Sequence, residues 1–454
     1  MITSARLTAL LIRRTTDRTT LVLPVIAFAV VTALALTIFG GARFFFTVSE
    51  SDLSILYALL GTVATILLVV PLLTLCGAAA RLSTRRRDDR LATLRLLGAP
   101  RRMIAQVTVL EATFLALAGS LIGLVGHLAL VPLTGLLRFH GEQLGAGRVL
   151  ISPLGAAGCI LGLVAMATVS AIVGLRRVVV SPLGVRTRQQ PGRLSIWRVI
   201  GFAVVLIVGV FAVGSLSGRF GPVGLIAILG GAFGMTMVVL NLIGPPLVRA
   251  SARLMLRRLN RDPLAPRLLA ARTMLDDPKA AWRQVSGVAM TSFMAVFGGV
   301  GVAVSSIAGA TENTEVDAQN QMIATDILTG VLVTIAISFI TVACAVAVSQ
   351  AAVVLDRRDQ LVSLHRLGMP IRQINSARYR AVRRPLLLVA IGSALVAAVL
   401  VLPLTGMALL TQPLTLLVVA LALLVGCALV LGAVRLTDPL VSRSCSGLSA
   451  SLEL

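Results

Sequence analysis

The stretch from Arg85 to Arg102 reads RRRDDRLATLRLLGAPRR, and a related stretch from Leu355 to Arg372 reads LDRRDQLVSLHRLGMPIR. At an offset of 270 residues the copies share an acid, three leucines, a glycine and a proline: Asp89, Leu91, Leu94, Leu97, Gly98 and Pro100 in the first, and Asp359, Leu361, Leu364, Leu367, Gly368 and Pro370 in the second. Leucines three apart predict one face of a short amphipathic helix. The glycine suits the left-handed residue that ends a helix, and the proline prevents its continuation. Each copy therefore predicts a short charged helix between two apolar segments, which offers a contact surface.

The composition around these stretches is that of a membrane protein. Of the 454 residues, 57% are hydrophobic and 13% are charged, and the mean hydropathy is +0.97. A bilayer core is crossed by roughly 20 apolar residues in a helix. Ten runs are long enough, at about 21–41, 54–80, 103–137, 151–175, 197–217, 222–248, 284–310, 327–354, 385–402 and 414–434. The sequence therefore predicts an all-α polytopic membrane protein with about ten transmembrane helices.

The net charge of +23 is distributed unevenly between the two sides of the membrane. With the first connection placed outside, the outer segments hold only four of the 41 Lys and Arg: Arg43, Arg138, Arg148 and Arg219. This asymmetry fixes orientation during insertion and predicts that both termini are cytoplasmic. Nucleic-acid binding is excluded because the basic segments nearly lack the aromatic residues that stack on bases.

The cysteines indicate neither a disulfide framework nor a metal site. Cys76, Cys159, Cys344 and Cys427 lie inside apolar runs, and Cys445 lies near the end of the chain. None belongs to a Cys-x-x-Cys motif, and no histidine has a spacing suited to a metal. We expect them to be small packing residues.

The repeat extends beyond the two short helices. Pro132-Leu133-Thr134-Gly135 matches Pro403-Leu404-Thr405-Gly406, Pro153-Leu154 matches Pro413-Leu414, and Ser181-Pro182-Leu183 corresponds to Asp438-Pro439-Leu440. Both three-helix units begin on the same side, so the repeats are expected to be parallel rather than inverted. The predicted domains are an N-terminal helix at 1–50, a first repeat at 51–190, central helices five to seven at 191–320 and a second repeat at 321–454.

The chain resembles the FtsX-like permease domain of ABC transporters in the order of its features. A span is followed by basic residues, by Leu-x-x-Leu-x-x-Leu-Gly, by a proline and by two further spans. The resemblance covers about 55–185 and 325–441, and the ten-helix order is similar to that of BceB-type permeases without their large outer domain. The resemblance implies that the repeated loops are coupling elements that bind a separate ATPase. It assigns that role to Asp89, Leu91, Leu94, Leu97, Gly98 and Pro100, and to Asp359, Leu361, Leu364, Leu367, Gly368 and Pro370. Two coupling sites imply two ATPase subunits per permease.

The chain itself is not expected to be an enzyme. It has no Gly-x-x-x-x-Gly-Lys-Ser/Thr motif, and its single lysine, Lys279, follows Asp277-Pro278 in no phosphate-binding context. We therefore expect no cofactor on this chain, with ATP and Mg bound by the partner ATPase.

The expected function is that of the membrane subunit of an ATP-driven exporter or extractor in a bacterial plasma membrane. The short outer loops favour a hydrophobic or amphipathic substrate, such as a lipid, a drug or a peptide. One alternative is a protein that transmits ATPase motion to an outer cell-wall enzyme, as FtsX does. Another is an ATP-independent secondary carrier, which the scarcity of paired intramembrane charges disfavours.

Two polar residues inside spans are further candidates for a functional site. Glu111 is the carboxylate that lies well inside a span, where it either serves function or pairs with Arg101 and Arg102. His127 either carries a proton or ligand role or is a hydrogen-bonded packing residue. We interpret the glycines at 230–231, 298–299 and 301 as helix-packing residues.

Three segments outside the spans also carry expectations. The acids of the loop 311–326, which include Glu312, Glu315 and Asp317, either form a solvated loop or receive a cationic peptide. The phenylalanines at 44–46 resemble an interfacial belt. The segment from Ala270 to Leu275 predicts an amphipathic helix along the inner surface.

Overall fold

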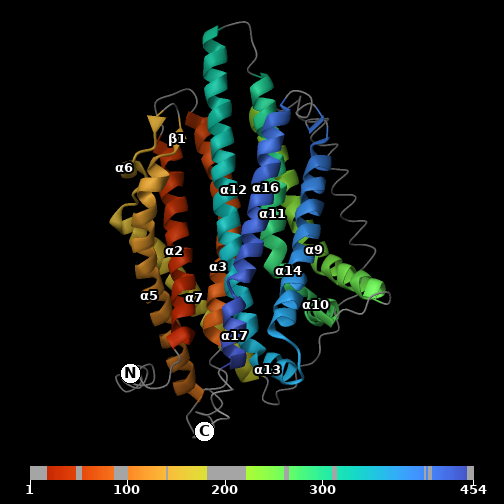
Figure 1. Cartoon of the computed structure of the whole chain (residues 1–454). Coiled ribbons are helices and arrows are strands. Elements are labelled where there is room, and N and C mark those ends of the chain that lie inside the picture. The colour runs from red at the N-terminus through yellow and green to blue at the C-terminus, as the bar shows by residue number, and fades with distance from the viewer. Residues whose placement is uncertain are drawn as a thin grey trace. The chain divides into compact units, whose positions relative to one another are not determined.

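The computed structural model of the chain describes residues 18–47, 54–85, 101–139, 142–180, 221–259, 265–308, 314–402, 405–406 and 412–446. Nearly all of these residues are helical (Figure 1). Nine helices in this part of the chain are long and apolar enough to cross a membrane. They are α2 (Arg18–Thr47), α3 (Ser54–Arg85), α5 (Arg101–Gly135), α7 (Pro153–Val180), α9 (Gly221–Leu259), α11 (Pro278–Ala308), α12 (Thr314–Asp356), α14 (Ile371–Leu400) and α16 (Pro413–Arg435). The all-helical membrane class is confirmed; the fifth expected span, 197–217, lies outside the described residues.

The chain divides into two compact units, and α12 contributes to both. The first unit holds α2, α3, α5, β1 (Arg138–Phe139), β2 (Glu142–Gln143), α6 (Ala146–Val149), α7 and the Cys344–Arg358 end of α12. The second unit holds α9, α10 (Ala265–Asp276), α11, α12 as far as Ala343, α13 (Arg358–Arg366) from Asp359 onward, α14, α16 and α17 (Asp438–Ser446).

Helix boundaries correspond between the two predicted repeats. At the offset of 270, α5 begins at Arg101 and α14 at the equivalent Ile371, each directly after a proline. The fourth and tenth expected spans, α7 and α16, begin at the matched prolines Pro153 and Pro413, within two residues of the expected starts. These boundaries agree with the alignment, and the parallel arrangement of the repeats stays a prediction.

Close contact between α2 and α5 forms the centre of the first unit. A Cβ added to Gly123 of α5 would lie 2.5 Å from the Ala29 carbonyl oxygen and 2.6 Å from Thr32 Cβ, both on α2. A Cβ added to Gly119, one turn earlier, would likewise lie too close to Phe28 and to the Val25 carbonyl oxygen. Small residues allow helix backbones to approach within a membrane, where burial from water does not drive association. The glycines of α5 therefore permit the α2–α5 contact.

A cap in the first unit joins α5 to α7. In its two-residue hairpin, Arg138 pairs with Gln143 and Phe139 with Glu142. The rings of Phe45 and Phe139 meet edge to face at 5.3 Å between centroids, and Phe44 is 5% exposed beside them. The expected interfacial belt is therefore wrong for Phe44, because its ring packs within this cap and not against lipid.

The second unit is centred on α11, which packs against α9, α14 and α16. Phe293 of α11 is fully buried against Ala397 and Leu400 of α14. A Cβ on Gly298 would contact Val331, and one on Gly299 would contact Val419. This confirms the packing interpretation for Gly298 and Gly299, whereas Gly301 has open space beside it and Gly231 likewise has no neighbour within 4 Å.

Two connecting segments are helical. The amphipathic segment expected at 270–275 belongs to α10, and its Ala270, Ala271 and Met274 are buried against α9 and Ala381 of α14. The expected loop 311–326 is wrong from Thr314 onward, since α12 begins there. Asp326, which the sequence placed in that loop, is a helical residue that is 7% exposed. At about 1.5 Å per residue, the 43 residues of α12 exceed what a bilayer core needs.

Candidate functional site

The first copy of the repeated stretch lies outside the described residues. The preceding helix, α3, ends at Arg85, and α5 begins at Arg101. The predicted contact residues Asp89, Leu91, Leu94, Leu97, Gly98 and Pro100 fall between them. The structure of the site is therefore described from the second copy, at residues 355–372.

The second copy forms the expected short helix, α13, and ends as expected. Gly368 has a φ of +91°, in the left-handed region. Its amide donates to the His365 carbonyl at 2.9 Å, and the Met369 amide donates to the Leu364 carbonyl at 3.1 Å. These two bonds form a Schellman motif, in which glycine accepts a conformation that a side chain would disfavour. The predicted helix and its glycine stop are confirmed for this copy.

Pro370 both stops α13 and starts α14. It occupies the N-cap position of α14 with a φ of −68°, and its carbonyl accepts from the Gln373 amide at 2.9 Å. The imidazole Nδ1 of His365 lies 3.1 Å from the Met369 carbonyl oxygen and braces the turn. Only residues 367–370 separate the two helices, and Figure 1 shows α13 lying crosswise to α14. The short, bonded turn makes α13 a fixed projection at the start of α14.

The three leucines of this copy do not share one environment. Leu361 is 8% exposed, Leu364 is partly buried and Leu367 is 84% exposed. The sequence expectation of one leucine face is thus wrong at its last position, because the helix ends at Arg366 and Leu367 turns out of it. Leu361 anchors α13 to the protein, while the Leu367 side chain is exposed on its surface.

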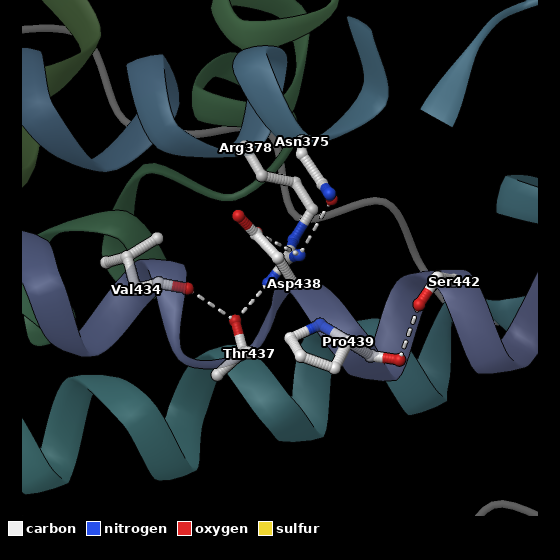
Figure 2. Close-up of polar contacts among 7 residues, drawn as sticks. All are labelled: Asn375, Arg378, Val434, Thr437, Asp438, Pro439 and Ser442. Carbon is white, nitrogen blue, oxygen red and sulfur yellow. Dashed lines mark hydrogen bonds and ion pairs between the residues drawn. The ribbon is translucent and has the colours of Figure 1, made fainter. Parts of the chain in front are cut away.

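Beside this turn, α14 is fastened to the end of α16 through Arg378. Figure 2 shows the guanidinium of Arg378 pointing at the turn between α16 and α17. Its Nη2 donates to Thr437 Oγ1 at 2.6 Å, and its Nη1 lies 3.6 Å from Asp438 Oδ1. Its Nη1 also lies 3.4 Å from Asn375 Oδ1 of the same helix (Figure 2). The Thr437 hydroxyl donates onward to the Val434 carbonyl at 2.7 Å, so its oxygen is free to accept from Arg378.

The next residue of α14 makes a second attachment to the same turn. The guanidinium of Arg435 lies over the Tyr379 ring, 4.9 Å from its centroid. Arg383 lies over the same ring at 5.9 Å. A cation over an aromatic face is an attractive contact. We call Arg378, Tyr379, Arg435, Thr437 and Asp438 the clasp.

The two intramembrane candidates, Glu111 and His127, do not form one site. They are sixteen residues apart on α5, which corresponds to about 24 Å along a helix. His127 is 2% exposed, and its Nδ1 lies 3.1 Å from Thr37 Oγ1 of α2. Because the Thr37 hydroxyl donates to the Ala33 carbonyl, the imidazole Nδ1 is the donor in this contact. The Thr37 contact agrees with a packing role for His127, which stays a prediction. Glu111 is partly buried.

Sequence reasoning missed Arg378 and Asp326. Arg378 occurs in a run of five arginines from Arg372 to Arg384, which suggested only a basic inner surface. Its helical position carried the missed signal, since Ile374 and Val382, four residues before and after it, are buried. Asp326 gave no such signal, because its burial depends on where α12 begins. Within the described ranges no three His, Cys, Asp or Glu side chains gather to hold a metal.

The comparisons with known proteins find a family match within the first predicted repeat. Residues 75–183 match the family described as FtsX-like permease C-terminal. The match begins within α3, includes the first copy of the repeated stretch and α5, and extends past the end of α7. Comparison with curated proteins gave no match. The chain is therefore a polytopic membrane protein with an FtsX-like permease domain at residues 75–183.

Proposed function

We propose that this chain is the permease subunit of an ABC transporter and that α13 is one of two elements that dock a separate ATPase. The family found at residues 75–183 works with ABC ATPases, which supports a partner of that kind. The observation that carries the proposal is the geometry of α13. It is anchored by Leu361, held by a Schellman motif and ended by a leucine that is 84% exposed.

The charges of the second unit support a cytoplasmic position for α13. Arg249 and Arg253 lie in the last part of α9, and α10 packs against both α9 and α14. The first half of α14 carries Arg372, Arg378, Arg380, Arg383 and Arg384. Basic residues near span ends favour the cytoplasmic side. The proposal therefore places α13, α10 and α17 on the inner side of a bacterial plasma membrane, with both termini cytoplasmic.

The proposed cargo is a hydrophobic or amphipathic molecule that enters from the bilayer. The outer connection between α5 and α7 is limited to residues 136–152, and its cap is filled by its own side chains. It leaves no large domain in that connection to capture a polar substrate. ATP hydrolysis occurs on the partner, with one ATPase for each of the two coupling elements.

Co-purification with a co-expressed candidate ATPase tests the docking step. We expect Leu97→Glu combined with Leu367→Glu to reduce the bound ATPase at least about 30-fold, because a central apolar contact contributes about 2 kcal/mol or more. Leu367 is 84% exposed, so the change at this position leaves the fold intact.

Leu154 provides the matched control for this experiment. It is also 84% exposed, and it is the second residue of α7, at the outer end of that helix. Leu154→Glu is expected to retain the wild-type amount of ATPase. Equal retention by the double variant would show that the repeated loops are not the docking elements.

A further inference from the structure

Arg378 occupies the buried face of α14, where an arginine is unusual. Its side chain is 11% exposed, and the neighbouring turns of that face present Ile374 and Val382, which are 0% and 2% exposed. Burying a guanidinium is costly unless its donors and charge are matched. The Nη1 and Nη2 donors of Arg378 are directed to Thr437, Asp438 and Asn375. Two of these three acceptors belong to the α16–α17 turn, so the buried charge is used to join two helices.

The clasp lies close to the proposed docking element along the chain. Arg378 is seven residues after Ile371, the first residue of α14, which corresponds to about 10 Å along the helix. The turn between α13 and α14 is fixed by Gly368 and Pro370. A displacement of α13 therefore moves the first turns of α14, and the clasp connects those turns to the end of α16.

The first repeat lacks the residues to build such a clasp. At the offset of 270, Arg378 and Tyr379 correspond to Thr108 and Val109. When Ser181-Pro182-Leu183 is aligned with Asp438-Pro439-Leu440, Asp438 corresponds to Ser181 and Arg435 to Val178. No charged residue stands at any of these first-repeat positions. The ionic clasp is thus specific to the second repeat.

We propose that Arg378 and Asp438 are a positioning pair that links α13 to the tenth expected span, α16, in the second repeat alone. The inference rests on the proposed function, in which an ATPase moves α13. Coupling between distant sites needs a physical element whose position both sites influence. The α13–α14 turn and the clasp form such an element. The two repeats therefore respond unequally when their ATPase subunits move.

Distance measurements on the full-length permease alone test the link. Spin labels are placed at Leu367 and Ser442, both exposed, in a background whose five native cysteines are replaced by alanine, and the protein is reconstituted in lipid nanodiscs. Pulsed electron paramagnetic resonance reports the spread of the distance between labels. We expect a narrow distribution with Arg378 intact and a distribution at least about twofold broader in Arg378→Gln.

Two further variants test whether broadening in Arg378→Gln comes from loss of the clasp and not from a general loss of fold. Arg372→Gln removes an exposed arginine from the same helix and is expected to leave the distribution unchanged. Thr437→Val removes one acceptor with little change in shape and is expected to give an intermediate width. An unchanged distribution in Arg378→Gln would overturn the clasp, as would equal broadening in Arg372→Gln.

Measuring both ATPase stimulation and ATPase binding distinguishes a failure of the clasp from a failure of the proposed function. In Arg378→Gln, permease-dependent stimulation of ATP hydrolysis is expected to fall about fivefold or more, the range of allosteric coupling, while ATPase co-purification is unchanged. Arg378→Lys keeps the charge without the planar fork and is expected to recover part of the stimulation. Undiminished stimulation in Arg378→Gln would overturn the proposed link. Absence of ATPase binding by the wild type would instead overturn the proposed function, with the resonance result still deciding whether the clasp holds the helices.

Discussion

Replacing Gly123 with valine is expected to destabilise the first unit more than any surface change. The new Cβ meets the Ala29 carbonyl oxygen and Thr32 Cβ of α2 at distances that no real side chain accepts. One obstacle is a backbone atom, which has no rotamer to move aside. Overpacking of this kind costs about 1–3 kcal/mol, and the backbone contact places Gly123→Val at the upper end.

Thermal unfolding of the detergent-solubilised permease measures this effect. The fraction that remains monodisperse after heating is followed by size-exclusion chromatography. Gly162→Val on α7 is the matched control, because that glycine is exposed and has no neighbour within 4 Å. We expect a clearly lower midpoint for Gly123→Val and a midpoint near that of the wild type for Gly162→Val. Equal midpoints for the two variants would contradict the close α2–α5 contact.

Truncating Phe293 to alanine is expected to give the largest loss in the second unit. Phe293 is 0% exposed and packs between α11 and α14, with the Phe297 ring stacked on it at 6.1 Å between centroids. Inside a membrane, the unfolded side chain already lies in lipid, so the transfer from water contributes little. The loss comes from the cavity and its missing contacts, about 2 kcal/mol for a volume near 100 Å³.

The same thermal assay tests this prediction. Phe114→Ala removes an identical side chain from a position on α5 that is 60% exposed. That side chain faces outward, so its truncation leaves no internal cavity and is expected to have little effect on the midpoint. If both variants lowered the midpoint equally, the burial of Phe293 between α11 and α14 would be wrong.

The sequence was sufficient to predict the helices and many of their ends. Apolar runs gave the spans, and prolines gave the starts of α7 and α16. The ninth span was expected only from 385, whereas α14 begins at Ile371. The stop at Gly368 was also predictable, because glycine followed two residues later by proline has a local physical meaning. Such features depend only on neighbours in the chain, so a single sequence carries them.

The predictions that were wrong concern side chains whose surroundings are set by residues outside their own stretch of sequence. Phe44 was assigned to a lipid interface because its contact with Phe139 is not visible in the sequence. Arg378 was counted as one of many basic inner residues, although its partner Asp438 lies 60 residues away. The leucine face was overextended, since the exposure of Leu367 follows from where α13 ends and turns.

Site-directed photo-crosslinking in cells tests the docking role of α13 most directly. A photoreactive phenylalanine analogue replaces Leu367, and another replaces Met322. Met322 is 43% exposed in the first part of α12, which the proposed topology places on the outer side. After irradiation, adducts are identified by mass spectrometry. Docking at α13 predicts an adduct with an ABC ATPase, recognised by its nucleotide-binding motifs, from position 367 and none from position 322. An adduct with that ATPase from position 322 alone would contradict docking at α13. So would the lack of an adduct at position 367 in cells where the ATPase co-purifies with the permease.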